Sequence, residues 1–130
     1  MKVAWDRVLN LILWILQGSL ALLFLYCGAG KLNRNAGFWI ELFAKMVRQN
    51  RNRAMVPLFA GSLEVVCAIL LLIPGTSAIA AVLLAFTMGG AVVTHLFILH
   101  DAYGGFFPAF TLLLLVVVAW KRGRLRTITN

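Results

Sequence analysis

The sequence predicts an all-α membrane protein, a four-transmembrane-helix bundle with an amphipathic interfacial helix between helices one and two. Three observations lead to this prediction. Of the 130 residues, 62% are hydrophobic and only 12% are charged, about half of the roughly 25% charged residues of a soluble domain. Four apolar stretches reach or approach the about 20 residues that a helix needs to cross a membrane. A fifth stretch, between the first two, is amphipathic.

Each apolar stretch should be a helix, because backbone polar groups in lipid must be satisfied within their own segment. The expected spans are 8–32, 57–73, 77–99 and 106–120, of which the second and fourth are short. Prolines suit the start of a helix, where the missing N–H costs little; Pro57 and Pro108 stand there. Pro74 and Gly75 make a tight turn, after which Thr76 or Ser77 can cap the third helix. The spans and one long connection use the whole chain, which predicts a single membrane domain, 1–130.

The connection between the first two spans is expected to contain an amphipathic helix over about 37–49. Its apolar residues, Trp39 and Phe43 among them, fall on one arc at 100° per residue, and its polar residues fall on the other. Such a helix lies in the membrane interface. Two interpretations stay open: it anchors the chain to headgroups, or it covers a pocket between the transmembrane helices.

The net charge of +8 favours contact with anionic headgroups rather than nucleic acid, because the basic residues cluster just outside the spans. The positive-inside rule gives a tie for orientation in the cell membrane. Six basic residues stand on each side, at positions 2, 7, 121, 122, 124 and 126 and at positions 31, 34, 45, 48, 51 and 53. We expect the termini to be cytoplasmic, because the basic tail follows directly on the last span.

Small residues recur at four-residue steps in the third span, at Ser77, Ala81, Ala85 and Gly89. Membrane helices approach closely along such a ribbon. It predicts either packing within the bundle or contact with a second copy, so the oligomeric state stays open.

Three ionisable side chains are expected in one leaflet, beneath the segment that carries Trp39. Lys31 ends the first span, while Glu64 and His95 lie roughly 10 and 7 Å inside the same face. A lone carboxylate in hydrocarbon costs at least about 2.5 kcal/mol. Glu64 should therefore pair, with Lys31 as first choice and His95 as second, or else become protonated or contact water.

The polar group is either a tie between helices or part of a binding site for a ligand, a quinone or a proton. The candidate residues are Lys31, Glu64, His95 and Trp39. No catalytic residue, metal site or covalently bound cofactor is predicted, since the chain has no nucleophile triad, phosphate loop or zinc spacing. Cys27 and Cys67 differ in depth by about 9 Å, beyond the roughly 7 Å reach of a disulfide.

The sequence resembles the DoxX and DoxX-like family of small four-helix membrane proteins. The resemblance rests on LALLFLYCGAGKL, with Gly28 and Lys31, on GSLEVVCAILLLIPG, with Gly61 and Glu64, and on MGGAVVTHLFILH. It implies a four-helix membrane bundle and marks Lys31 and Glu64 as family-pattern positions. Named members resemble subunits of a thiosulfate:quinone oxidoreductase, and one branch resembles receptor-assembly chaperones. The long basic segment 48–53 departs from many members.

Three functions are compatible with these features. The first is an accessory subunit of a quinone-linked membrane oxidoreductase, which needs a cofactor-bearing redox partner because no residue here carries electrons. The second is an assembly or structural subunit. The third is a small proton-coupled transporter that acts as a dimer, since a membrane-embedded Glu64 can couple a proton to a substrate.

Overall fold

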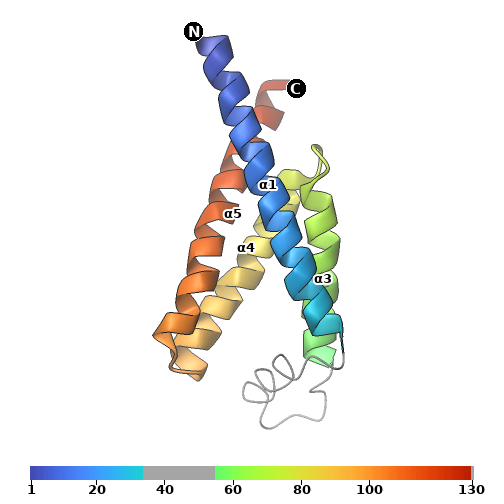
Figure 1. Cartoon of the computed structure of the whole chain (residues 1–130), viewed down its shortest axis with the longest axis vertical. Coiled ribbons are helices and arrows are strands. Elements are labelled where there is room, and N and C mark those ends of the chain that lie inside the picture. The colour runs from blue at the N-terminus through green and yellow to red at the C-terminus, as the bar shows by residue number, and fades with distance from the viewer. Residues whose placement is uncertain (34–54, 130) are drawn as a thin grey trace.

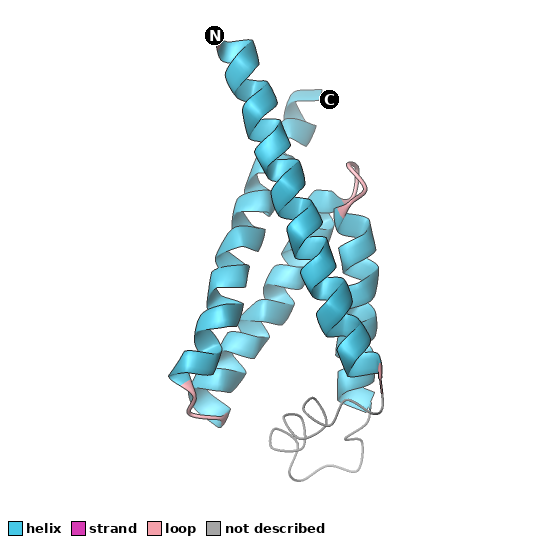
Figure 2. Cartoon of the chain, in the orientation of Figure 1, coloured by secondary structure: helices cyan, strands magenta, loops and turns pink. Residues whose placement is uncertain are grey.

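Helices form almost all of the chain that the structure, a computed structural model, describes: residues 1–33 and 55–129 (Figure 1). In chain order they are α1 Lys2–Leu32, α3 Met55–Leu71, α4 Ser77–Val93, the π-helix η1 Thr94–Ile98 and α5 Ala102–Thr129. Short loops join α3 to α4 and η1 to α5 (Figure 2). The all-α prediction is confirmed for these residues. The amphipathic segment 37–49, with Trp39, lies outside them.

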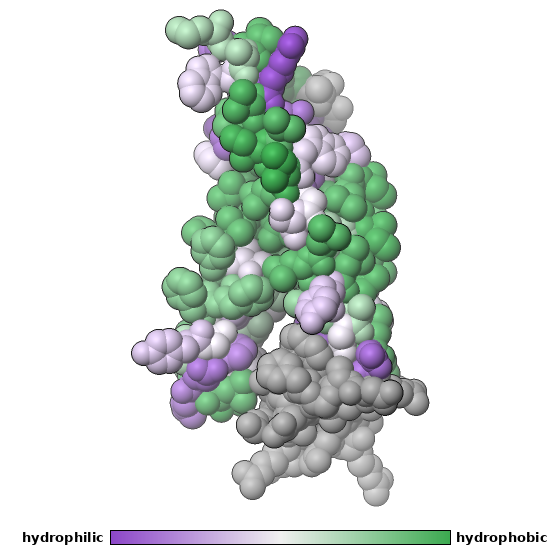
Figure 3. Space-filling model, viewed as in Figure 1, coloured by the Kyte–Doolittle hydropathy of each residue, from purple (hydrophilic) through white to green (hydrophobic). Residues whose placement is uncertain are grey.

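Three helical segments are long and apolar enough to cross a membrane: α1, α4 together with η1, and α5. The apolar α3 is shorter, because its 17 residues rise about 26 Å, against about 30 Å of hydrocarbon. On the face seen in Figure 3, hydrophobic residues cover the middle of the molecule, and polar residues gather toward its ends. The chain is thus an integral membrane protein whose described part contains three full-length spans and one shorter apolar helix.

The first and last helices are longer than the apolar stretches that predicted them. α1 begins at Lys2 instead of Val8, and α5 covers Ala102–Thr129 instead of 106–120. Hydropathy marks the lipid-facing part of a helix, whereas the backbone hydrogen bonds continue into polar flanks where caps allow it. At its start, α5 is capped by Asp101, whose Oδ1 accepts a hydrogen bond from the Gly104 N–H at 2.9 Å.

The turn between α3 and α4 is present, but the expected cap is wrong. Thr76 is the residue before α4, yet its side chain makes no capping bond there. Its hydroxyl instead donates to the Leu70 carbonyl at 2.8 Å, and the Ser77 hydroxyl donates to the Pro74 carbonyl at 3.2 Å. The last carbonyls of α3 have no α-helical partner, so the Thr76 hydroxyl can donate to the Leu70 carbonyl, whereas the Pro74 carbonyl that Ser77 contacts lies in the turn itself.

The helices pack as two antiparallel pairs, α1 with α3 and α4 with α5, and α3 also contacts α4. Both termini lie at one end of the molecule, and the pairs diverge toward the other end (Figure 1). Close packing occurs where the four helices meet, around Phe24, Leu71, Leu84, Leu115 and Val118. The ends of α1 and η1 and the starts of α3 and α5 therefore share one face, as the connectivity predicts.

Candidate functional site

Two glycines let α1 and α3 approach closely. A Cβ atom on Gly28 would lie 2.8 Å from the Gly61 carbonyl oxygen, and a Cβ on Gly61 would lie 2.8 Å from the Gly28 carbonyl oxygen. Neither distance is compatible with a side chain unless the backbones move apart. The two helices therefore cross with their backbones in contact, as small residues allow in membrane proteins.

An ion pair lies beside the point where α1 and α3 cross at Gly28 and Gly61. Lys31 and Glu64 each stand three residues after a glycine of the crossing, and the two helices run in opposite directions (Figure 1). Since each Cα–Cβ bond tilts toward the N-terminus of its own helix, both side chains lean back toward the crossing. Lys31 Nζ lies 2.5 Å from Glu64 Oε1. The pairing expected from their common leaflet is present.

The Glu64 carboxylate is buried, and only one of its two oxygens accepts a hydrogen bond from the described residues. The Glu64 side chain is 0% exposed and that of Lys31 is 9% exposed. Glu64 Oε1 accepts the hydrogen bond from Lys31. The other oxygen, Oε2, is buried and has no hydrogen-bond partner within residues 1–33 and 55–129. A buried acceptor without a donor costs about 1–3 kcal/mol, so Oε2 can accept a hydrogen bond from a ligand, a water or another chain.

His95 belongs to a different part of the structure. It lies in η1, and its Nδ1 is 3.6 Å from Asp101 Oδ2. This part of the α4–α5 pair lies away from the lower end of the α1–α3 pair, because the pairs diverge there (Figure 1). A common depth in the membrane does not bring side chains together when helices diverge. A role for His95 and Trp39 beside the Lys31–Glu64 pair stays a prediction.

The turn that holds His95 depends on Asp101 and Gly104. The π-helix ends at Ile98, and beyond it His100 has a left-handed backbone with φ of 51°. The Asp101 N–H donates to the His95 carbonyl at 2.8 Å. The Asp101 Oδ1 in turn accepts a hydrogen bond from the Gly104 N–H. A Cβ on Gly104 would overlap the Asp101 carboxylate and lie 2.6 Å from His95 Nδ1. A larger residue at this position would therefore require the Asp101 and His95 side chains to move.

A second polar cluster joins α1 to α5 near the end that holds the termini. Arg122 Nε donates to Gln17 Oε1 at 2.6 Å, and Arg122 Nη1 donates to Asn10 Oδ1 at 2.9 Å. The guanidinium carbon lies 4.9 Å from the centre of the Trp14 ring. The fully buried Gln17 in turn donates to the Leu71 carbonyl at 2.7 Å. One glutamine thus links three helices.

The sequence alone predicts only part of this cluster. Gln17 is a polar residue inside the first apolar stretch, 8–32, whereas the sequence places Arg122 at the headgroups with the rest of the basic tail. An arginine can turn back along a helix and donate hydrogen bonds inside the protein. Arg122 does so through Nε and Nη1, whereas its buried Nη2 has no hydrogen-bond partner among the described residues. Only the helix positions show that these two side chains meet.

Neither cysteine forms a disulfide in the structure. Cys27 is partly buried, Cys67 is buried, and both are free thiols. Across residues 1–33 and 55–129 no group of three or more His, Cys, Asp or Glu side chains is placed to hold a metal ion. The polar chemistry of these residues therefore centres on the Lys31–Glu64 pair.

Comparison with known proteins gives one finding. A family model described as the DoxX-like family matches residues 15–119. This range contains both glycines of the α1–α3 crossing and both members of the ion pair. No curated protein and no solved structure matches the chain.

Proposed function

Because this chain belongs to the DoxX-like family, we propose that it is an accessory subunit of a quinone-linked membrane oxidoreductase. In this proposal α3 forms a fourth span, and the protein is a multi-pass protein of the cell membrane with cytoplasmic termini. A short helix can span where the bilayer thins locally or where polar flanks reach the interface. The partner in the complex carries the redox cofactor.

One observation supports the proposal most directly: Glu64 Oε2 has no hydrogen-bond partner in the described part of the chain. Lys31 holds the other carboxylate oxygen in place, so the orientation of Oε2 is set by the pair. A quinol hydroxyl is a suitable donor to a fixed carboxylate oxygen, and a charged acceptor gives a stronger hydrogen bond than a neutral one. A donor that reaches Oε2 would recover the free energy that burial without a partner costs.

The chemistry divides between this chain and its partner. Oxidation of a quinol releases two electrons and two protons. In this proposal Glu64 accepts a hydrogen bond from one quinol hydroxyl and assists the departure of that proton, while the proton of the other hydroxyl leaves away from this carboxylate. The electrons go to a flavin, haem or iron–sulfur centre of the partner, because amino-acid side chains of this kind do not carry them. The chain alone would therefore show no turnover.

A structural subunit is the second candidate, and the glycine crossing favours it. The contact of Gly28 with Gly61 brings the two backbones together, and the ion pair would then only tie α1 to α3. In that case Glu64→Gln would lower the amount of folded protein and have no separate effect on quinone. The dimeric transporter is the third candidate. It predicts that the protein co-purifies as a homodimer without redox partners.

The test is gentle detergent extraction of the protein from its own membranes, followed by mass spectrometry of co-purifying proteins, lipids and quinones. Wild type is compared with Glu64→Gln and with Asp6→Asn. Asp6 is an exposed carboxylate at the start of α1, so Asp6→Asn makes the same chemical change outside the site. We expect a cofactor-bearing partner in all three samples, and retained quinone in wild type and Asp6→Asn only.

Two results would contradict the proposal. A sample with neither a redox partner nor quinone, but with a homodimer, would support transport instead. Equal quinone in Glu64→Gln and wild type, with less folded protein, would leave the ion pair a purely structural role.

A further inference from the structure

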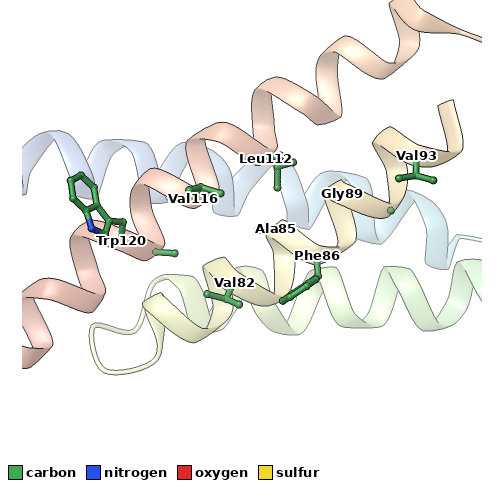
Figure 4. A pocket seen from close by; sticks show the side chains of 10 residues that line it. Val82, Ala85, Phe86, Gly89, Val93, Leu112, Val116 and Trp120 are labelled. Carbon is green, nitrogen blue, oxygen red and sulfur yellow. The ribbon is translucent and has the colours of Figure 1, made fainter. Parts of the chain in front are cut away.

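An apolar groove runs along the outer side of α4 and α5, away from the Lys31–Glu64 pair. Its volume is about 750 Å³, within the range of about 300–1,000 Å³ that small-molecule sites occupy. Figure 4 shows side chains of both helices along it. Its lining includes Val82, Ala85, Gly89 and Val93 of α4 and Trp120 of α5.

Adjacent glycines keep the groove open. A Cβ on Gly89 or on Gly90 would meet no atom within 4 Å, so packing inside the described chain does not require either glycine. Glycine in the middle of a helix costs roughly 0.5–1 kcal/mol relative to alanine. Two glycines that the packing of the described residues does not require, in the lining of a groove, are suited to an occupant from outside the chain.

The groove is apolar along its length and cationic at one end. Trp120 lies at one end of the groove, on the part of α5 nearer the C-terminus, and Val82 is the labelled α4 residue nearest that end (Figure 4). Lys121 Nζ is 5.2 Å and Arg124 Cζ is 5.0 Å from the centre of the Trp120 ring. Arg122 turns the other way, onto Trp14 of α1. Lys121 and Arg124 therefore lie beside the tryptophan that lines this end of the groove, whereas Arg122 belongs to the α1–α5 cluster.

We propose that this groove binds one anionic phospholipid, with an acyl chain along Ala85 and Gly89 and the headgroup phosphate beside Lys121 and Arg124. An apolar groove with two cations at one end is complementary to a lipid with an anionic headgroup. Lysine and arginine near the membrane surface attract anionic headgroups, and tryptophan prefers the same interface.

The length of the groove favours a lipid over a helix of a second copy. From Val82 to Val93 the α4 helix rises roughly 16 Å, about half of the roughly 30 Å hydrocarbon thickness. An acyl chain has about this length. A transmembrane helix of a second copy would instead need a contact surface through both leaflets.

The test is lipid binding by native mass spectrometry of the full-length protein in detergent. The probes are phosphatidylglycerol and phosphatidylcholine with identical acyl chains. The headgroup variant is Lys121→Gln with Arg124→Gln, and its control, Lys2→Gln with Arg7→Gln, removes two charges from the start of α1. The groove variant is Gly89→Leu, and its control is Gly18→Leu, because a Cβ on Gly18 also meets nothing within 4 Å.

We expect one phosphatidylglycerol to remain bound where phosphatidylcholine dissociates. The headgroup variant should bind phosphatidylglycerol about fivefold more weakly for each charge removed, and Gly89→Leu should lose it, while both controls behave as wild type. Equal binding of the two lipids, or unchanged binding in the headgroup variant, would overturn the proposal. A homodimer that Gly89→Leu dissociates would assign the groove to a second copy and would also overturn it.

Discussion

Gly28 and Gly61 lie face to face where α1 crosses α3, and the carbonyl oxygen of each occupies the space that a side chain on the other would need. The relationship is reciprocal, so a change at either residue acts on the same contact. It also sets the separation of the backbones that carry Lys31 and Glu64. The crossing and the ion pair are therefore expected to respond together.

Gly28→Ala should separate the two helices and destabilise the protein. The added methyl group would lie 2.8 Å from the Gly61 carbonyl oxygen, and backbone atoms cannot rotate away as a side chain can. Overpacking of this kind costs about 1–3 kcal/mol, which exceeds the helix-propensity gain of up to about 1 kcal/mol from glycine to alanine. Unfolding in mixed detergent micelles, followed by circular dichroism, measures the loss.

Gly18→Ala is the matched control for this prediction. It makes the same change on the same helix, where a Cβ meets nothing within 4 Å. Its stability should equal or slightly exceed that of wild type. Equal destabilisation by Gly18→Ala and Gly28→Ala would show that helix-wide effects, not the crossing, decide stability.

The Lys31–Glu64 pair should show strong coupling in a double-mutant cycle. Removal of one partner leaves a buried charge uncompensated, which costs about 3–5 kcal/mol. Lys31→Met and Glu64→Gln should each be destabilising, and the double variant should be more stable than the sum of the two losses predicts. The same unfolding assay on the four proteins gives the coupling free energy. Additive losses would mean that the 2.5 Å contact adds little to stability in the membrane protein.

The contrast between the two polar clusters shows what the sequence could predict. Glu64 is a lone carboxylate in an apolar run, and depth along each helix was enough to select Lys31 as its partner. Arg122 and Gln17 also meet, at 2.6 Å, but they lie 105 positions apart. Their contact depends on the angle between α1 and α5, which no local pattern records.

The helix ends were predicted least well, for a related reason. Hydropathy located the lipid-facing stretches, whereas α5 extends through Ala102–Thr129 because a cap and a polar flank continue the backbone hydrogen bonds. The groove beside Trp120 was also missed as a site. The small-residue ribbon was recognised, but its first half, with Ser77 and Ala81, is buried in the bundle, and its second half, with Ala85 and Gly89, lines the groove.

Gln17→Leu should remove the hydrogen bonds by which one α1 side chain links α3 and α5. The Leu71 carbonyl loses its donor and Arg122 Nε loses its acceptor. Hydrogen bonds to charged groups contribute about 1.5–3 kcal/mol, so we expect a loss of this size in the free energy of unfolding. Ser19→Ala is the control, because the Ser19 hydroxyl donates only to the Ile15 carbonyl of its own helix. A Gln17→Leu protein as stable as Ser19→Ala would contradict a structural role for the cluster.

Asp101 should stabilise the start of α5 as a cap and not as a charge. Its Oδ1 accepts the Gly104 N–H at 2.9 Å, whereas its Oδ2 lies 3.6 Å from His95 Nδ1 at a site that is half exposed. Loss of a cap costs about 1 kcal/mol, and an exposed ion pair contributes about 0–1 kcal/mol. Because asparagine caps as well as aspartate, Asp101→Ala should fray the helix start and Asp101→Asn should not.

Hydrogen exchange at the Gly104 amide measures this difference directly. In Asp101→Ala the amide loses its acceptor, so its exchange should be about fivefold faster, the factor that corresponds to about 1 kcal/mol. In Asp101→Asn the rate should stay close to that of wild type, because the amide oxygen replaces Oδ1. Amides in the middle of α5, such as that of Leu115, serve as an internal reference. Equally fast exchange in both variants would mean that the contact with His95, which requires the negative charge, holds the helix start.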